Sequence, residues 1–208
     1  MPKRNSIKSY ETDQYYHIFN RGGNQQDIFI EPEDYFYFLN LFRRHLSKDT
    51  VSDRYGRMFE KYYDEVELVA FCLMPNHFHL LCLLKKPDGI VHLMRSTMTA
   101  YTMYFNKKYK HTGKLYESAF LATRINNEAY LWQVSRYIHL NPIEFGYDYH
   151  NYVFSSMTYY TENKQADWIM TNRLVETDRD KQEYLEFVSD YETMNKEMKY
   201  LKNILAAE

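Results

Sequence analysis

Residues 67–84 read ELVAFCLMPNHFHLLCLL, two apolar runs separated by the turn-forming pair Pro75-Asn76. The runs 67–74 and 77–84 have the length and composition of β-strands, and Pro-Asn favours a turn between them. A link this short requires antiparallel pairing, because parallel strands need a crossover of about a dozen or more residues. The centre of the chain is therefore predicted to be a β-hairpin.

The segments on either side of this hairpin extend the pattern to strand, helix, strand, strand, helix, strand, helix. Apolar periodicity, turn residues and capping residues locate the flanking elements. They are a strand at residues 15–20, a helix at 31–46, a helix at 90–109, a strand at 119–125 and a helix at 127–140. This order predicts an α+β fold, a ferredoxin/RRM-like antiparallel sheet with helices on one face.

The balance of charge divides the chain into two expected units. Residues 1–150 would form the sheet domain, and residues 151–208, with 7 basic and 11 acidic side chains, an acidic, mostly helical C-terminal extension. From Tyr184 onward, apolar side chains recur at helical spacing. They are Phe187, Val188, Tyr191, Met194, Met198, Leu201 and Leu205. Such a stripe favours a helix packed on its own domain over a coiled-coil seam.

Composition excludes several classes of protein. Apolar residues make up 45% of the chain, enough for a buried core, so global disorder is excluded. The longest apolar run, residues 68–74, is far shorter than the roughly 20 residues of a membrane helix. The amino-terminal residues lack the apolar stretch of a secretory signal, and two cysteines give no disulfide framework. We therefore expect a cytoplasmic protein with no membrane partner.

A local excess of positive charge points to a nucleic-acid partner, although the net charge of the chain is −2. Residues 85–125 carry eight basic and two acidic side chains, and tyrosines on which bases can stack are interleaved with them. The chain around Gly22 could approach a nucleic-acid backbone closely. The candidate DNA contacts are Arg21, Gly22, Arg95, Lys107, Lys108, Lys110, Lys114 and Arg124. The alternative is a solvated basic helix face.

The most specific local feature is the His77-Phe78-His79 triplet. Residues two apart on a strand point to the same face, so both imidazoles project together while Phe78 faces the apolar side. Tilted toward each other, their nitrogens could hold one divalent ion. The alternative is a pair of core histidines satisfied by hydrogen bonds.

A second candidate feature lies at the end of the last predicted helix. Tyr130, Val134, Tyr137 and Asn141 are spaced by four, three and four residues, so they share a helical face. Pro142 disfavours helical geometry at the residue before it, so Asn141 is expected to cap the helix. Taken alone, Tyr137 is more typical of an amphipathic core residue with its hydroxyl in water.

Four segments occur together in an order that resembles a known family. They are YHIFNRGGN (16–24), AFCLMPNHFHLL (70–81), YFNKKYKHTGKLY (104–116) and YLWQVSRYIHLNP (130–142). Over about residues 10–150 the chain resembles the single-tyrosine HUH transposases, in particular the REP-associated tyrosine transposase branch. In "HUH" two histidines flank a bulky apolar residue, as in His77-Phe78-His79. The family often has a Gln and a basic residue around Glu117 and Ala119, which this chain lacks.

The resemblance implies a role for each candidate residue. His77 and His79 would bind a divalent metal, Asn141 would complete the metal site through its amide oxygen, and Tyr137 would attack DNA. Oxygen-rich coordination favours magnesium, and the two imidazoles favour manganese. The implied partner is single-stranded or hairpin DNA, and the implied assembly is a monomer or a homodimer.

The expected function is that of a metal-dependent single-stranded DNA endonuclease and strand transferase, a transposase that forms a 5′-phosphotyrosine intermediate. The chain has no GxxxxGK[ST] loop for a nucleotide, which agrees with joining that needs no ATP. Two alternatives remain open. One is a metal phosphodiesterase in which water attacks and Tyr137 is structural. The other is a non-catalytic, RRM-like nucleic-acid-binding module.

Overall fold

The structure is a computed structural model, and it describes residues 10–49, 52, 56, 58–162, 164 and 166–190. Its centre is a four-stranded antiparallel sheet, ordered β2-β3-β1-β4. The strands are β1 (Gln14–Arg21), β2 (Val66–Met74), β3 (His77–Leu84) and β4 (Leu121–Ile125). This is the strand order of the ferredoxin/RRM-like arrangement, so the predicted α+β fold is confirmed.

The predicted hairpin forms between β2 and β3, with Met74 opposite His77. Strand β1 pairs with the other edge of β3, and Phe19 and Arg21 lie opposite His79 and His77. Because paired residues point to the same face, this register fixes which β1 side chains surround the two histidines.

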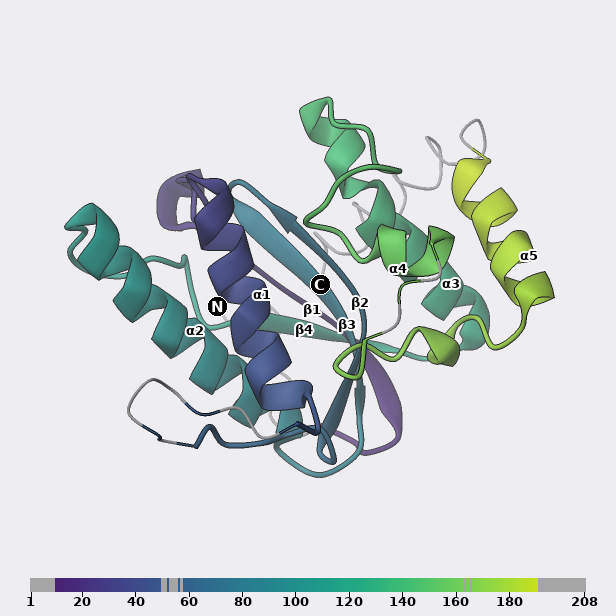
Figure 1. Ribbon diagram of the computed structural model, residues 1–208, viewed down its shortest axis with the longest axis horizontal. Helices are drawn as coiled ribbons and strands as arrows, with labels where there is room; N and C mark the ends of the chain where they lie inside the picture. The colour runs from purple at the N-terminus through teal and green to yellow at the C-terminus, as the bar shows by residue number, and fades with distance from the viewer. Residues whose placement is uncertain are drawn as a thin grey trace, which may run out of the picture.

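Helices cover both faces of the sheet, so the expectation of helices on one face was wrong (Figure 1). Helices α1 (Pro32–Leu46) and α2 (Gly89–Tyr109) pack on one face. Helices α3 (Glu128–Leu140), α4 (Met157–Thr161) and α5 (Asp178–Ser189) lie on the other side. The cause is the continuous apolar run in β2 and β3. Successive side chains of a strand point to opposite faces of the sheet, so an unbroken apolar run makes both faces apolar and both must be covered.

Three short 3-10 helices complete the described elements: η1 (Gly23–Gln25), η2 (Asn141–Phe145) and η3 (Thr171–Arg173). Asn127 caps α3, its side chain accepting from the backbone N–H of Tyr130. At the other end Asn141 keeps helical angles, with φ −50° and ψ −37°, and begins η2. Asn141 is the C-terminal cap of α3, as expected, but the expectation that Pro142 would disfavour helical geometry at Asn141 was wrong. The tighter 3-10 turn accommodates the proline at its second position.

The described part of the C-terminal extension packs against α3 and β2. The backbone N–H of Leu73 donates to the Phe154 carbonyl, and that of Ser156 donates to the Phe71 carbonyl. Tyr184 and Val188 of α5 are fully buried in the same apolar cluster as α3. The rest of the predicted stripe, Tyr191, Met194, Met198, Leu201 and Leu205, lies outside the described residues. Within the described residues, no helix is long and apolar enough to cross a membrane.

Candidate active site

The candidate site lies on the sheet face covered by α3. Phe78 and Leu80 of β3 point into the core beneath α1 and α2. His77 and His79 alternate with them and point the other way, as strand geometry requires. Tyr137 of α3 packs in the apolar cluster on this side. The fold therefore brings together His77, His79, Tyr137 and Asn141, which are far apart in the sequence.

Nε2 of His77 and the amide oxygen of Asn141 face each other at the site. Nδ1 of His77 lies 2.7 Å from Oδ1 of Asn76, to which it donates when the proton is on Nδ1. The Asn141 amide nitrogen donates to the Tyr137 carbonyl at 3.0 Å, which turns Oδ1 of Asn141 toward His77. That oxygen lies 3.1 Å from Nε2 of His77. A neutral imidazole can donate to only one of these two amide oxygens, so with the proton on Nδ1 the contact with Asn141 needs a second proton or a metal ion.

His79 is paired with a third histidine, His17 of β1. Nδ1 of His79 lies 2.9 Å from Nε2 of His17, and the two ring planes are within 20° of parallel. Burial lowers the pKa of His79 well below its usual value, and the neighbouring His77 and His17 lower it further. Burial also lowers the pKa of His17, to about 3. Both rings are therefore neutral near pH 7, and one proton lies between the two nitrogens.

The ring of Tyr137 lies against the histidines of its own chain. Its centroid is 5.2 Å from the His79 ring and 6.1 Å from the His17 ring, edge to face in both cases. Burial raises the pKa of Tyr137 to about 12, and a hydrogen bond from Asn141 partly opposes this effect. The Tyr137 residue is 8% exposed.

These residues fit a divalent metal ion. Two neighbouring ligand atoms on octahedral bonds of about 2.1 Å lie about 3.0 Å apart, close to the 3.1 Å between His77 Nε2 and Asn141 Oδ1. His79 adds a neutral imidazole whose ring centroid is 5.0 Å from that of His77. Two imidazoles and an amide oxygen add no negative charge. Among the described residues, no group of three or more His, Cys, Asp or Glu side chains is arranged to hold a metal.

Most of the predicted DNA contacts lie away from this face. Arg95, Lys107 and Lys108 are on α2, which covers the opposite face of the sheet, and Lys110 ends that helix. Lys108 is held by the buried carboxylate of Asp34 at 2.7 Å and by Glu31 at 3.0 Å. A strand of DNA at the histidines would not follow this helix face. The basic segment is thus not one continuous track to the candidate site.

Arg21 and Gly22 lie closer to the histidines. Arg21 is opposite His77 in the sheet and forms an exposed ion pair with Glu117. At Gly22, a Cβ atom would lie 2.1 Å from the Gln26 carbonyl oxygen, so this turn requires glycine whether or not DNA binds. Arg124 pairs with Glu11 at 2.7 Å, and Lys114 is exposed in the loop before β4.

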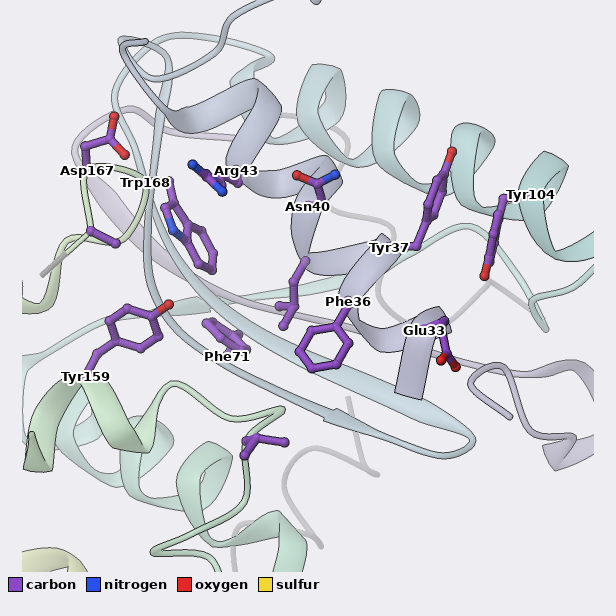
Figure 2. A pocket seen from close by; sticks show the side chains of 13 residues that line it. Glu33, Phe36, Tyr37, Asn40, Arg43, Phe71, Tyr104, Tyr159, Asp167 and Trp168 are labelled. Carbon is purple, nitrogen blue, oxygen red and sulfur yellow. The ribbon is translucent and has the colours of Figure 1, made fainter. Parts of the chain in front are cut away.

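A cavity of about 940 Å³ lies elsewhere in the structure (Figure 2). It lies between α1 and the C-terminal extension, with Tyr159, Phe71 and Trp168 toward one end and Tyr37 and Tyr104 toward the other. Phe71 and Trp168 belong to the core beneath α1 and α2, on the sheet face opposite the histidines. None of the candidate site residues lines it.

His17 is the site residue that the sequence reasoning missed. The segment YHIFN is predicted as a strand and contributes to the family resemblance, but neither argument gives its histidine a role. The available signal was a polar side chain within an apolar strand. Its place beside His79 follows from the register of β1 on β3, which pattern alone does not give.

Comparison with known proteins agrees with this fold. Residues 36–141, half of the chain, match the protein family described as "Transposase IS200 like". No curated protein matches the chain. The structure is similar to that of a REP-associated tyrosine transposase bound to a REP hairpin, with a TM-score of 0.52 and 14% identity over 77% of this chain and 88% of that one.

A second solved structure, a putative transposase from Deinococcus radiodurans, has a TM-score of 0.40 and 17% identity over 66% of this chain and 95% of that one. At these identities the first structure supports the fold and the second adds no argument. The family match over half of the chain is what identifies it. The chain belongs to the IS200-like transposase family and is a single-tyrosine transposase.

Proposed function

We propose that this transposase cleaves and rejoins single-stranded DNA at hairpin-containing sites, with Tyr137 as the nucleophile and a divalent metal held by His77, His79 and Asn141. One observation carries the proposal: the Tyr137 ring lies edge-on to His79, with centroids 5.2 Å apart, in the same chain. A tyrosine in this place can reach a phosphate held at the histidines without a helix from a second copy.

The reaction is a transesterification. The Tyr137 oxygen forms a bond to the scissile phosphorus, the bond from phosphorus to the 3′-oxygen breaks, and that oxygen leaves as a 3′-hydroxyl after taking a proton. The phenol proton passes to solvent. The product is a 5′-phosphotyrosine, and attack on it by another 3′-hydroxyl restores a phosphodiester and the free phenol.

The environment of Tyr137 explains why the reaction needs a cation. A phenol with a pKa of about 12 costs about 7 kcal/mol to ionise at pH 7. When bound, a magnesium or manganese ion would supply positive charge that polarises the scissile phosphate and favours the phenolate. Asn141 joins the two parts, because one end of its amide contacts His77 and the other holds the Tyr137 carbonyl.

The position of Tyr137 also favours a flexible substrate. The phenol is mounted on a helix, next to a sheet, and is 8% exposed. A single strand can turn one phosphate into such a position more easily than a rigid duplex can. Arg21, opposite His77 in the sheet, is the cation best placed to hold a neighbouring phosphate. The solved relative named above is bound to a hairpin, which supports hairpin DNA as the substrate class.

Cleavage of a 3′-labelled single strand with a hairpin tests the proposal. With Mn²⁺, the label should move onto a protein band that survives denaturing electrophoresis, and chelator should prevent this. Tyr137→Phe should remove the band, while Tyr130→Phe, on the same helix, should keep it. Cleavage without attachment would support water as the nucleophile. DNA binding with no cleavage under any metal would support a binding module.

A further inference from the structure

His17 is buried at the site, and the proposed reaction gives it no part. It is 1% exposed, on β1, diagonally across from His79 of β3. Its Nε2 lies 2.9 Å from Nδ1 of His79, and its ring also stacks on Phe19 at 5.0 Å. A polar ring held this firmly between two strands has a fixed orientation.

The hydrogen bond between the two rings can exist in two forms. In the first, Nδ1–H of His79 donates to His17, and the His79 Nε2 keeps its lone pair. In the second, Nε2–H of His17 donates to His79, whose own Nε2 must then carry a proton. Only the first form can bind a metal through Nε2, because a protonated imidazole nitrogen has no lone pair to give.

The first form makes one demand on the surroundings of His17. In that form His17 carries its proton on Nδ1, which is buried and has no hydrogen-bond partner among the described residues. Thr123 of β4 is paired directly with His17 in the sheet, and its buried hydroxyl oxygen is likewise without a partner in that part of the chain. Directly paired residues point to the same face, so this hydroxyl lies on the same face of the sheet as the His17 ring, although no hydrogen bond joins it to Nδ1.

We propose that His17 is a positioning residue, which accepts the Nδ1–H of His79 and thereby holds the Nε2 lone pair of His79 ready for the metal. The inference rests on the proposed metal site, and it adds a residue that contacts a metal ligand instead of the metal itself. A metal-binding imidazole is commonly oriented by an acceptor on its other nitrogen, and loss of that acceptor typically weakens metal affinity about 10–100-fold. Here the acceptor is a second imidazole.

Two measurements on the purified full chain test this role. Nitrogen-15 NMR of the metal-free protein reports which nitrogen of His79 is protonated, and calorimetric titration with Mn²⁺ reports affinity. In the wild type, His79 should be protonated on Nδ1. His17→Leu should lose this preference and bind Mn²⁺ about 10–100-fold more weakly. His17→Gln, whose amide oxygen can accept the same proton, should restore most of the affinity.

Matched controls separate the role from general damage. His45→Leu removes a histidine of similar burial on α1, beneath the opposite face, and should leave Mn²⁺ affinity unchanged. Protonation of His79 on Nε2 in the wild type would overturn the inference, and this needs no variant to fold. The inference would also be overturned if His17→Leu bound Mn²⁺ with the affinity of the wild type while His79→Ala had lost that affinity. Absence of Mn²⁺ binding by the wild type would instead contradict the proposed function.

Discussion

Oδ1 of Asn141, at the end of α3, lies 3.1 Å from Nε2 of His77, at the start of β3. This contact joins the helix that carries Tyr137 to the strand that carries both candidate ligands. With its proton on Nε2, His77 donates to Asn141, and with its proton on Nδ1 the proposed metal ion would stabilise this contact. The same amide donates to the Tyr137 carbonyl, so one side chain contacts both the candidate ligand His77 and the backbone of Tyr137.

Replacing Asn141 therefore has a specific consequence. We expect Asn141→Ala to lower Mn²⁺ affinity at least about 10-fold, because one of three protein ligands is lost. Titration calorimetry measures the change, and Asn151→Ala, an exposed asparagine outside the site, is the control. Unchanged affinity in Asn141→Ala would limit the metal site to the two histidines.

The two faces of the sheet should differ in their contribution to DNA binding. Arg21→Ala should weaken binding of a hairpin-flanking single strand and reduce the salt slope by about 0.7, the contribution of one phosphate contact. Arg95→Ala, on α2 beneath the opposite face, should change neither. Glu117→Gln releases Arg21 from its ion pair and should strengthen binding. Fluorescence anisotropy at several salt concentrations measures all three, and an equal loss in Arg21→Ala and Arg95→Ala would contradict the assignment of the DNA to the histidine face.

Lys108 is expected to stabilise the folded protein. The side chain of Asp34 has no exposed area, and Lys108 is its cationic partner at 2.7 Å. Lys108→Met should lower the free energy of unfolding by about 2 kcal/mol, because the buried carboxylate loses that partner. Lys107→Met, at an exposed neighbour, should change it by less than about 0.5 kcal/mol. Urea unfolding distinguishes the two, and equal stabilities would show that the ion pair is unimportant.

Sequence patterns predicted the helices and strands of this fold well, and the way in which they pack on one another less well. Residues 77–84 were predicted as a strand with the bounds that the structure has, because Pro75-Asn76 and the apolar runs mark both ends. The second helical layer was missed, although the unbroken apolar run of β2 was its signal. The places of Lys108 and His17 depend on how helices and strands pack, which spacing along the chain does not specify.

The sequence predicted which candidate residues share a face of one element, but not how those elements pack together. His77 and His79 share a face by strand periodicity alone, and Tyr137 and Asn141 share one by helical periodicity. That these two faces meet depends on α3 crossing the sheet face opposite α1 and α2. The roles of these residues came from resemblance to a family, and they stay predictions.

The pH dependence of the free energy of unfolding should reflect the lowered pKa of the buried His139. Its two ring nitrogens each lie 2.7 Å from a hydroxyl, of Tyr184 and of Ser156, and burial lowers its pKa to about 3. Below pH about 6.5 the unfolded chain binds a proton that folded His139 does not, so stability falls as pH decreases from about 6.5 toward 3.

Replacement of His139 should reduce by one the number of protons that the chain takes up on unfolding in this pH range. Between pH 4 and 6 the slope of the unfolding free energy should be smaller in His139→Gln than in the wild type, by up to about 1.4 kcal/mol per pH unit. Urea unfolding at a series of pH values gives both slopes. Equal slopes would mean that His139 is protonated in the folded protein.

The most direct test of the central claim is mass spectrometry of the protein after reaction with a single-stranded hairpin substrate and Mn²⁺. After nuclease and protease digestion, the peptide containing Tyr137 should carry a nucleotide linked through its 5′-phosphate, and Tyr137→Phe should give no modified peptide. A nucleotide on Tyr130, or complete cleavage with every tyrosine unmodified, would contradict the account.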